Sequence, residues 1–90
     1  MIKLIVRHPV TNFNDWHRAY KSYTEIRDRY KVRSDEVFQA VEDPNLVTVT
    51  HVFDSLSDAQ TMMASDEVKA ALAKAGVSGP PTVWMLTPAE

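Results

Sequence analysis

The order of the regularly patterned segments is the feature of this sequence that most limits its fold. Short runs of β-branched and apolar residues alternate with longer stretches in which apolar residues recur every three or four positions. We expect strands at 2–8, 37–41, 46–53 and 82–86, and helical stretches at about 13–30 and 55–75. This β-α-β-β-α-β order predicts an α+β, ferredoxin-like fold. Right-handed crossovers then place both helical stretches on one face of an antiparallel sheet with strand order 4-1-3-2.

Capping and turn residues mark the ends of these segments. Asn12 or Asn14 can cap the first helical stretch, and the turn residues 42–45 predict a hairpin between the second and third strands. Ser65 begins a second capping signal inside the second helical stretch, which is therefore expected to break or kink there. Gly76 suits the left-handed position that ends a helix.

The third predicted strand has apolar residues on both of its faces. Val47, Val49 and Phe53 alternate with Leu46 and Val52. Helices on one face leave the other bare in a monomer, and an apolar patch on an open sheet marks an interaction surface. A homodimer that buries one sheet against its copy is the expected arrangement.

The composition supports this expectation by removing the alternatives. The 90 residues form one domain, 1–90, and a chain of this length buries only roughly 60–65% of its unfolded surface. Such small domains rely on disulfides, metals or oligomerisation. Cysteine is absent, and the three histidines lack the spacing of metal ligands, so no metal site is predicted.

The charge pattern limits the partners. The formal net charge is −2 with both signs well mixed, so no basic stripe exists to bind nucleic acid. The apolar runs are far shorter than the roughly 20 residues that span a bilayer, so no membrane partner is expected. The N-terminal residues are typical of a strand and not of a signal peptide, and a cytoplasmic location is the default expectation.

Several short motifs are similar to those of a known family. They are Arg7-His8-x-Val10, Asn14-x-Trp16, Asp43-Pro44-Asn45 and Ala75-Gly76-Val77-x-Gly79-Pro80-Pro81. Together they resemble the small dimeric α+β barrel proteins, relatives of the antibiotic-biosynthesis monooxygenase domain that include uncharacterised members labelled "cyclase". The resemblance implies a homodimer whose two sheets form a barrel. It also implies a pocket in each subunit between the sheet and its helices.

The resemblance raises two activities, and the residues favour one of them. Haem-degrading members use an Asn on the first strand and a His on the second helix. Here the first strand lacks Asn and residues 56–75 lack His, so this activity is disfavoured. Cofactor-free monooxygenase members oxidise electron-rich aromatic rings, which implies no cofactor and a small hydrophobic or aromatic ligand.

His8 and His51 are the candidate catalytic residues. Both fall on the strand faces expected to point at the helices, and neutral imidazole can take a proton from a phenol or enol near neutral pH. The competing interpretation is that each is a semi-buried histidine bonded to backbone or to a tyrosine. Trp16, Tyr20 and Tyr23 are candidate substrate-binding residues that could stack a planar ligand, although a helical aromatic stripe is more often core.

Three functions stay open at this point. The first is a cofactor-independent monooxygenase or cyclase acting on a small aromatic or polyketide-like molecule. The second is a non-catalytic homodimeric binding or accessory protein for a hydrophobic ligand. The third is a purely structural dimer with side chains filling the pocket. The charged run 27–33 is expected to face solvent in all three.

Overall fold

One antiparallel sheet organises the chain in the computed structural model, which describes residues 1–90. Its strands are β1 (Ile2–Pro9), β2 (Ser34–Gln39), β3 (Leu46–Phe53) and β4 (Thr82–Leu86). The order across the sheet is β2-β3-β1-β4, so β1 and β3 are central and β2 and β4 are edges. This order confirms the predicted ferredoxin-like topology.

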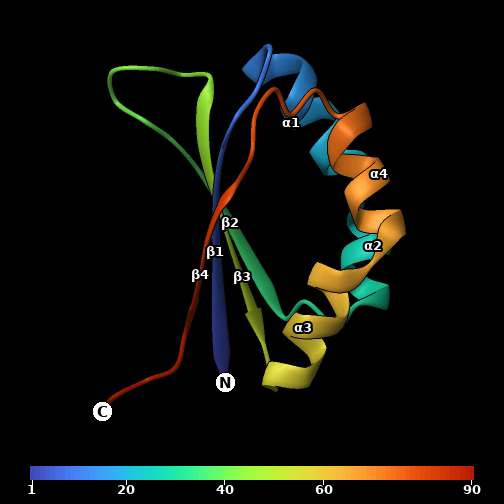
Figure 1. Ribbon diagram of the computed structural model, residues 1–90, viewed down its shortest axis with the longest axis vertical. Coiled ribbons are helices and arrows are strands. Elements are labelled where there is room, and N and C mark those ends of the chain that lie inside the picture. The colour runs from blue at the N-terminus through green and yellow to red at the C-terminus, as the bar shows by residue number, and fades with distance from the viewer.

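The helices form a single layer on one side of the sheet (Figure 1). They are α1 (Phe13–Ser22), α2 (Thr24–Arg29), α3 (Leu56–Ala64) and α4 (Asp66–Lys74). Figure 1 shows the two layers edge-on, with the hairpin between β2 and β3 projecting away from the helices. None of the helices has both the length and the apolar character that a membrane span requires.

The first helical stretch is broken at Tyr23, so the prediction of one helix over 13–30 was wrong. Tyr23 leaves helical geometry with ψ near 21°, and its N–H bonds to the carbonyl of Tyr20. The side chains of Thr24 and Arg27 donate to the carbonyls of Lys21 and Tyr20 in turn. Because side chains satisfy these carbonyls, the chain can bend here without leaving buried backbone groups unpaired.

The second helical stretch breaks at Ser65, as predicted. Ser65 has an extended ψ of 125°, and its hydroxyl oxygen accepts from the N–H of Val68 to cap α4. Asn12 caps α1 by accepting from the N–H of Asp15, which settles the choice between Asn12 and Asn14. Gly76 has a φ of +91° just after α4, the left-handed conformation predicted for it.

The second strand is shifted relative to the predicted 37–41. It covers Ser34–Gln39, whereas Ala40 and Val41 belong to the hairpin, and Val41 is 99% exposed. Because β2 begins with the polar residues Ser34–Glu36, the pattern of apolar residues did not indicate where the strand starts. An edge strand pairs on one side only, so it tolerates polar side chains that a central strand would have to bury.

The core is divided into two apolar clusters at opposite ends of the helix-covered face. One contains Val10, Trp16, Val47, Val49 and Ala75. The other contains Leu4, Phe53, Ala59 and Met62. The space between these clusters is where the candidate site lies.

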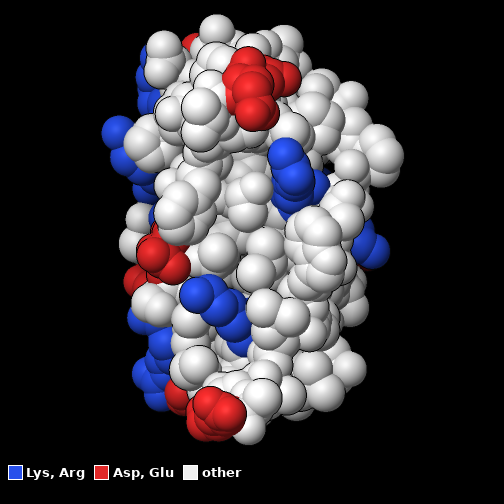
Figure 2. All heavy atoms as spheres, turned by 90° about the vertical axis from the view of Figure 1, so that its left-hand side faces the viewer, with Lys and Arg blue, Asp and Glu red and all other residues white.

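The other sheet face carries no helix. Strand register and side-chain alternation place on it an apolar set made of Ile5, Phe38, Leu46, Val52, Trp84 and Leu86. Figure 2 looks onto this face and shows mostly uncharged side chains, interrupted by a few charged ones. Glu36 lies on the same face and is paired with Lys3 at 3.8 Å and with the Thr50 hydroxyl at 3.1 Å. The bare apolar face expected from the sequence is therefore present.

The two-cluster core predicts a clear difference between buried and hairpin positions. Phe53 has no exposed surface, so Phe53→Ala should lower the free energy of unfolding by about 3–5 kcal/mol. The exposed Val41→Ala should change it by less than about 0.5 kcal/mol. Urea titration of both variants measures this, and a Phe53→Ala loss below about 1 kcal/mol would contradict the assigned core.

Candidate functional site

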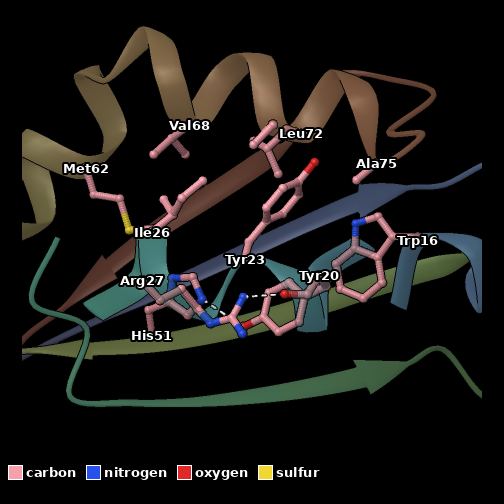
Figure 3. A pocket seen from close by; sticks show the side chains of 11 residues that line it. Trp16, Tyr20, Tyr23, Ile26, Arg27, His51, Met62, Val68, Leu72 and Ala75 are labelled. Carbon is pink, nitrogen blue, oxygen red and sulfur yellow. Dashed lines mark hydrogen bonds between the residues drawn. The ribbon is translucent and has the colours of Figure 1, made fainter. Parts of the chain in front are cut away.

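A cavity lies between the sheet and the helix layer. It has two adjoining compartments of about 90 and about 60 Å³. The compartments share six wall residues, which are Trp16, Tyr20, His51, Met62, Val68 and Leu72. Their walls are mostly apolar, and Figure 3 shows the smaller compartment beneath α3 and α4. This open space argues against the interpretation in which side chains fill the pocket completely.

His8 and His51, the two histidines singled out from the sequence, line the same compartment. His8 comes from β1 and His51 from the adjacent β3, and both side chains are buried on the helix-covered face. In the register His51 lies opposite Leu4, four positions along β1 from His8. The two imidazoles therefore lie toward opposite ends of the larger compartment.

A hydrogen-bonded chain of three side chains connects His51 to the sheet edge. The Tyr20 hydroxyl lies 3.0 Å from Nε2 of His51 and donates to Oδ2 of Asp35 at 2.7 Å. Asp35 is opposite His51 in the register between β2 and β3, so the pairing of these strands positions the carboxylate. Since the single Tyr20 proton goes to Asp35, His51 donates from Nε2 and keeps Nδ1 free to accept a proton.

The surroundings of Tyr20 and His51 keep these two members of the hydrogen-bonded chain neutral near pH 7. Burial, then the hydrogen bond to Asp35, raises the pKa of Tyr20 above its ordinary value. Burial lowers the pKa of His51 to about 4, against an opposing effect of the Asp35 carboxylate. His51 is thus an uncharged imidazole with a negative group two hydrogen bonds away.

Arg27 covers Tyr20 instead of facing solvent, so that prediction was wrong for this residue. Its guanidinium carbon lies 3.9 Å from the centre of the Tyr20 ring, a cation–π distance. Its Nη1 donates to the Tyr20 carbonyl at 2.7 Å, as the dashed line in Figure 3 marks. The break between α1 and α2 is what brings Arg27 back over the ring.

The predicted aromatic residues divide between the compartments. Trp16 is buried, and its ring lies 5.0 Å from Tyr20 and 5.7 Å from His8 by centroids. Trp16 and Tyr20 line both compartments, whereas Tyr23 lines only the smaller one, where it points toward α4 (Figure 3). Trp16 therefore belongs to the core and to the cavity wall at once.

Asp35 was missed by sequence reasoning. It precedes the predicted strand and lies in the polar stretch Ser34–Glu36, so nothing local marks it. Only the observed hairpin register pairs it with His51, because counting back from the predicted turn 42–45 would place Asp35 one position away, opposite Val52. No group of three or more His, Asp or Glu side chains gathers anywhere in the chain as metal ligands would.

Acid should destabilise the protein through His51. The pKa of His51 falls from 6.5 in the unfolded chain to about 4 in the folded one. The contribution of neutral His51 to folding stability is therefore fully present above pH 6.5 and is lost as the pH drops toward 4. The loss attributable to His51 should reach about 2 kcal/mol at pH 5. Urea titrations at pH 7.5 and 5.0 test this.

His51→Gln should flatten that decline. His8, whose pKa burial also lowers, contributes with the same sign, so some decline should persist in this variant. Hydrogen-bonded ion pairs with Arg33 and Arg29 lower the carboxyl pKa values of Asp54 and Glu67. Their contributions to folding stability are therefore lost only when the pH falls below the ordinary pKa range of carboxyl groups. An equal decline in the wild type and His51→Gln would contradict the assignment.

The structure is similar to solved structures, although no family model and no curated protein matches the sequence. An antibiotic biosynthesis monooxygenase structure aligns over all of both chains with a TM-score of 0.77 and 13% identity. SnoaB, a cofactor-independent oxygenase from Streptomyces nogalater, aligns over 99% of this chain and 93% of its own, with a TM-score of 0.78 and 9% identity. A protein of unknown function from Nitrosomonas europaea aligns over 99% of this chain and 89% of its own, with a TM-score of 0.77 and 16% identity. This chain therefore has the fold of the antibiotic biosynthesis monooxygenases, as the sequence resemblance predicted.

Proposed function

We propose that this protein is a cofactor-independent oxygenase acting on a small phenolic molecule held in the cavity between helices and sheet. The observation that carries the proposal is the Asp35–Tyr20–His51 chain ending at an apolar cavity wall. An activated substrate that reacts directly with O₂ needs only a base and a dry, shaped site. The likeness to SnoaB, described as a cofactor-independent oxygenase, supports the same choice.

His51 is the proposed base. Its Nδ1 takes the phenolic proton, while Nε2–H stays bonded to the Tyr20 oxygen. The Tyr20–Asp35 pair then stabilises the imidazolium and fixes its orientation, the role that a carboxylate plays behind histidine in hydrolase triads. Tyr20 and Asp35 are positioning residues here, because they act through His51.

The low pKa of His51 is compatible with this role. Moving a proton from a phenol of pKa about 10 to an imidazole of pKa about 4 costs about 8 kcal/mol before the ions attract each other. Turnover of about 1–10 per second corresponds to a barrier of about 16–17 kcal/mol, so this step fits within it. The phenolate and imidazolium also attract each other more strongly in an apolar site than they would in water.

The proposed reaction balances without a cofactor. A benzene-1,4-diol and one O₂ give a hydroxyquinone and one water, and the ring supplies all four electrons. One oxygen atom forms the new C–O bond, the other leaves as water, and the displaced ring hydrogen ends in the product hydroxyl or water. The base activates the ring by making the electron-rich phenolate.

We also propose that the bare sheet face binds a second copy of the chain. Only 12 of 90 residues are buried in the isolated chain, a thin core for an independent domain. Lys3 and Glu36 neutralise each other in an ion pair on the bare face, which leaves the exposed Arg7 as a cation there without an ion-pair partner in the same chain. Trp84, 44% exposed on this face, is the kind of large aromatic anchor that stabilises interfaces.

Substituting His51 tests the catalytic proposal. His51→Gln should lower kcat by at least about 100-fold in an oxygen-uptake assay with benzene-1,4-diols, because the base is lost. Tyr20→Phe keeps the ring and its Arg27 contact, and should lower kcat by about tenfold with a small effect on KM.

His17 provides the matched control. It is a histidine on α1 that lines neither cavity compartment, so His17→Gln should keep wild-type turnover. Unchanged turnover in His51→Gln would remove His51 as the base. Saturable diol binding with no oxygen uptake by the wild type would favour the non-catalytic binding protein.

Charge placed on the bare face tests the homodimer. Trp84→Glu should convert a dimer to a monomer in light scattering, because two carboxylates would face a desolvated apolar interface. Leu56→Glu is matched in exposure, at 46%, but lies on the helix layer and should stay dimeric. A wild-type protein that is still monomeric at about 100 μM, a dissociation constant equivalent to only about −5.5 kcal/mol, would contradict the proposal.

A further inference from the structure

The hydrogen-bonded chain behind His51 runs from the cavity wall to solvent. His51 is buried and lines both compartments, Tyr20 is half-buried, and Asp35 is exposed on the edge strand β2. The Tyr20 hydroxyl lies 3.0 Å from Nε2 of His51 and 2.7 Å from Oδ2 of Asp35. In hydrolase triads the carboxylate behind the histidine is buried, so the exposure of Asp35 is a difference that orientation of the imidazole alone does not explain.

The inner end of this chain is accessible from the cavity. Nδ1 of His51 has no hydrogen-bond partner within the protein, and Nδ1 of His8 is the one fully enclosed side-chain nitrogen or oxygen in that condition. Nδ1 of His51 therefore keeps accessible surface, on a side chain that lines both compartments. A proton donor in the cavity can reach this atom while Nε2 stays bonded to Tyr20.

The groups around His51 leave one route by which a proton can travel from its ring to water. The side chains that α3 and α4 contribute to the cavity walls are all apolar, namely Met62, Met63, Val68, Ala71 and Leu72. On β1, His8 forms no hydrogen bond with His51. On α2, Arg27 donates to the Tyr20 carbonyl, and a guanidinium accepts no proton. Asp35 is the one carboxylate bonded to the Tyr20 hydroxyl.

We propose that Tyr20 and Asp35 relay the substrate proton from His51 to solvent. This inference rests on the proposed function and deepens it, because it gives the proton taken from the phenol a path that does not cross the cavity. As Nδ1 takes the phenolic proton, the Nε2–H proton moves to the Tyr20 oxygen and the Tyr20 hydroxyl proton moves to Oδ2 of Asp35. Asp35 then passes a proton to water, and His51 is left neutral with its proton on Nδ1.

The relay runs in reverse after the ring has reacted with O₂. Nδ1 gives its proton to the oxygen atom that leaves as water, and a proton from solvent returns through Asp35 and Tyr20 to Nε2. Each transfer breaks one N–H or O–H bond and forms another, so no electron moves and no net proton is gained over a turnover. Burial lowers the pKa of His51 and disfavours a lasting imidazolium, which the relay avoids.

The pH dependence of turnover separates the relay from an ion pair kept inside the cavity. When the proton stays on His51, ionising the phenol exchanges no proton with solvent, and kcat should not change with pH. When the proton leaves through Asp35, wild-type kcat for benzene-1,4-diol should rise about tenfold per unit between about pH 6.5 and 8.5, below the phenol pKa of about 10. Burial lowers the pKa values of His8 and His51, so neither histidine titrates over this rise. Oxygen uptake, corrected for uncatalysed oxidation, measures it.

Asp35→Asn is the decisive variant, because the asparagine oxygen still accepts from the Tyr20 hydroxyl but takes no proton. Its kcat should be flat over the same pH range, and so should that of Tyr20→Phe, which lacks the middle member of the relay. Asp28→Asn removes another exposed aspartate and the same charge, and should keep the wild-type slope. A flat wild-type profile, or the wild-type slope in Asp35→Asn, would overturn the relay and leave the proposed function intact. No oxygen uptake at any pH would overturn both.

Nitrogen-15 NMR of the His51 ring tests the relay without turnover. In the protein without substrate at about pH 7.5, the relay requires a neutral ring with its proton on Nε2 and none on Nδ1. The spectrum of the wild type should show this tautomer. A His51 ring with its proton on Nδ1 would have Tyr20 donating to Nε2 instead of to Asp35, and would overturn the relay whatever the pH profiles of the variants.

Discussion

The one-sided covering of the sheet is the constraint on which the rest of this structure depends. All four helices pack on one face, and each helical stretch is broken midway, at Tyr23 and at Ser65. Broken helices touch the sheet at two ends, and the core accordingly divides into two clusters. The cavity lies where neither cluster fills the space. The same asymmetry leaves the other sheet face bare and available to a second copy.

The first of these breaks also builds the polar part of the site. Because the chain bends at Tyr23, Arg27 returns over the Tyr20 ring and bonds to its carbonyl. Arg27 then covers one face of the Tyr20 ring, and hydrogen bonds to His51 and Asp35 hold its hydroxyl. A straight helix would carry Arg27 onward along its axis. The geometry that orients His51 therefore follows from a local departure from helical structure.

Local sequence signals predicted the elements that local forces determine. The alternation in Leu46–Phe53 gave β3 with its correct bounds, Ser65 marked a real helix break and Gly76 a real helix end. The pairing of the two candidate histidines on one cavity followed from strand periodicity and topology. By contrast, the break at Tyr23 is held by Arg27 and Thr24 side chains reaching back to carbonyls, which apolar periodicity does not encode. Asp35 acquires its partner only through the hairpin register, so its role depends on tertiary structure.

Isotope labelling of the product tests the central claim most directly. Protein loaded with benzene-1,4-diol is mixed with ¹⁸O₂ and quenched within one turnover. We expect a hydroxyquinone that carries one ¹⁸O atom, the second label in water, and no hydrogen peroxide, since the ring supplies all four electrons. An unlabelled quinone formed together with hydrogen peroxide, or unchanged diol, would contradict an oxygenase.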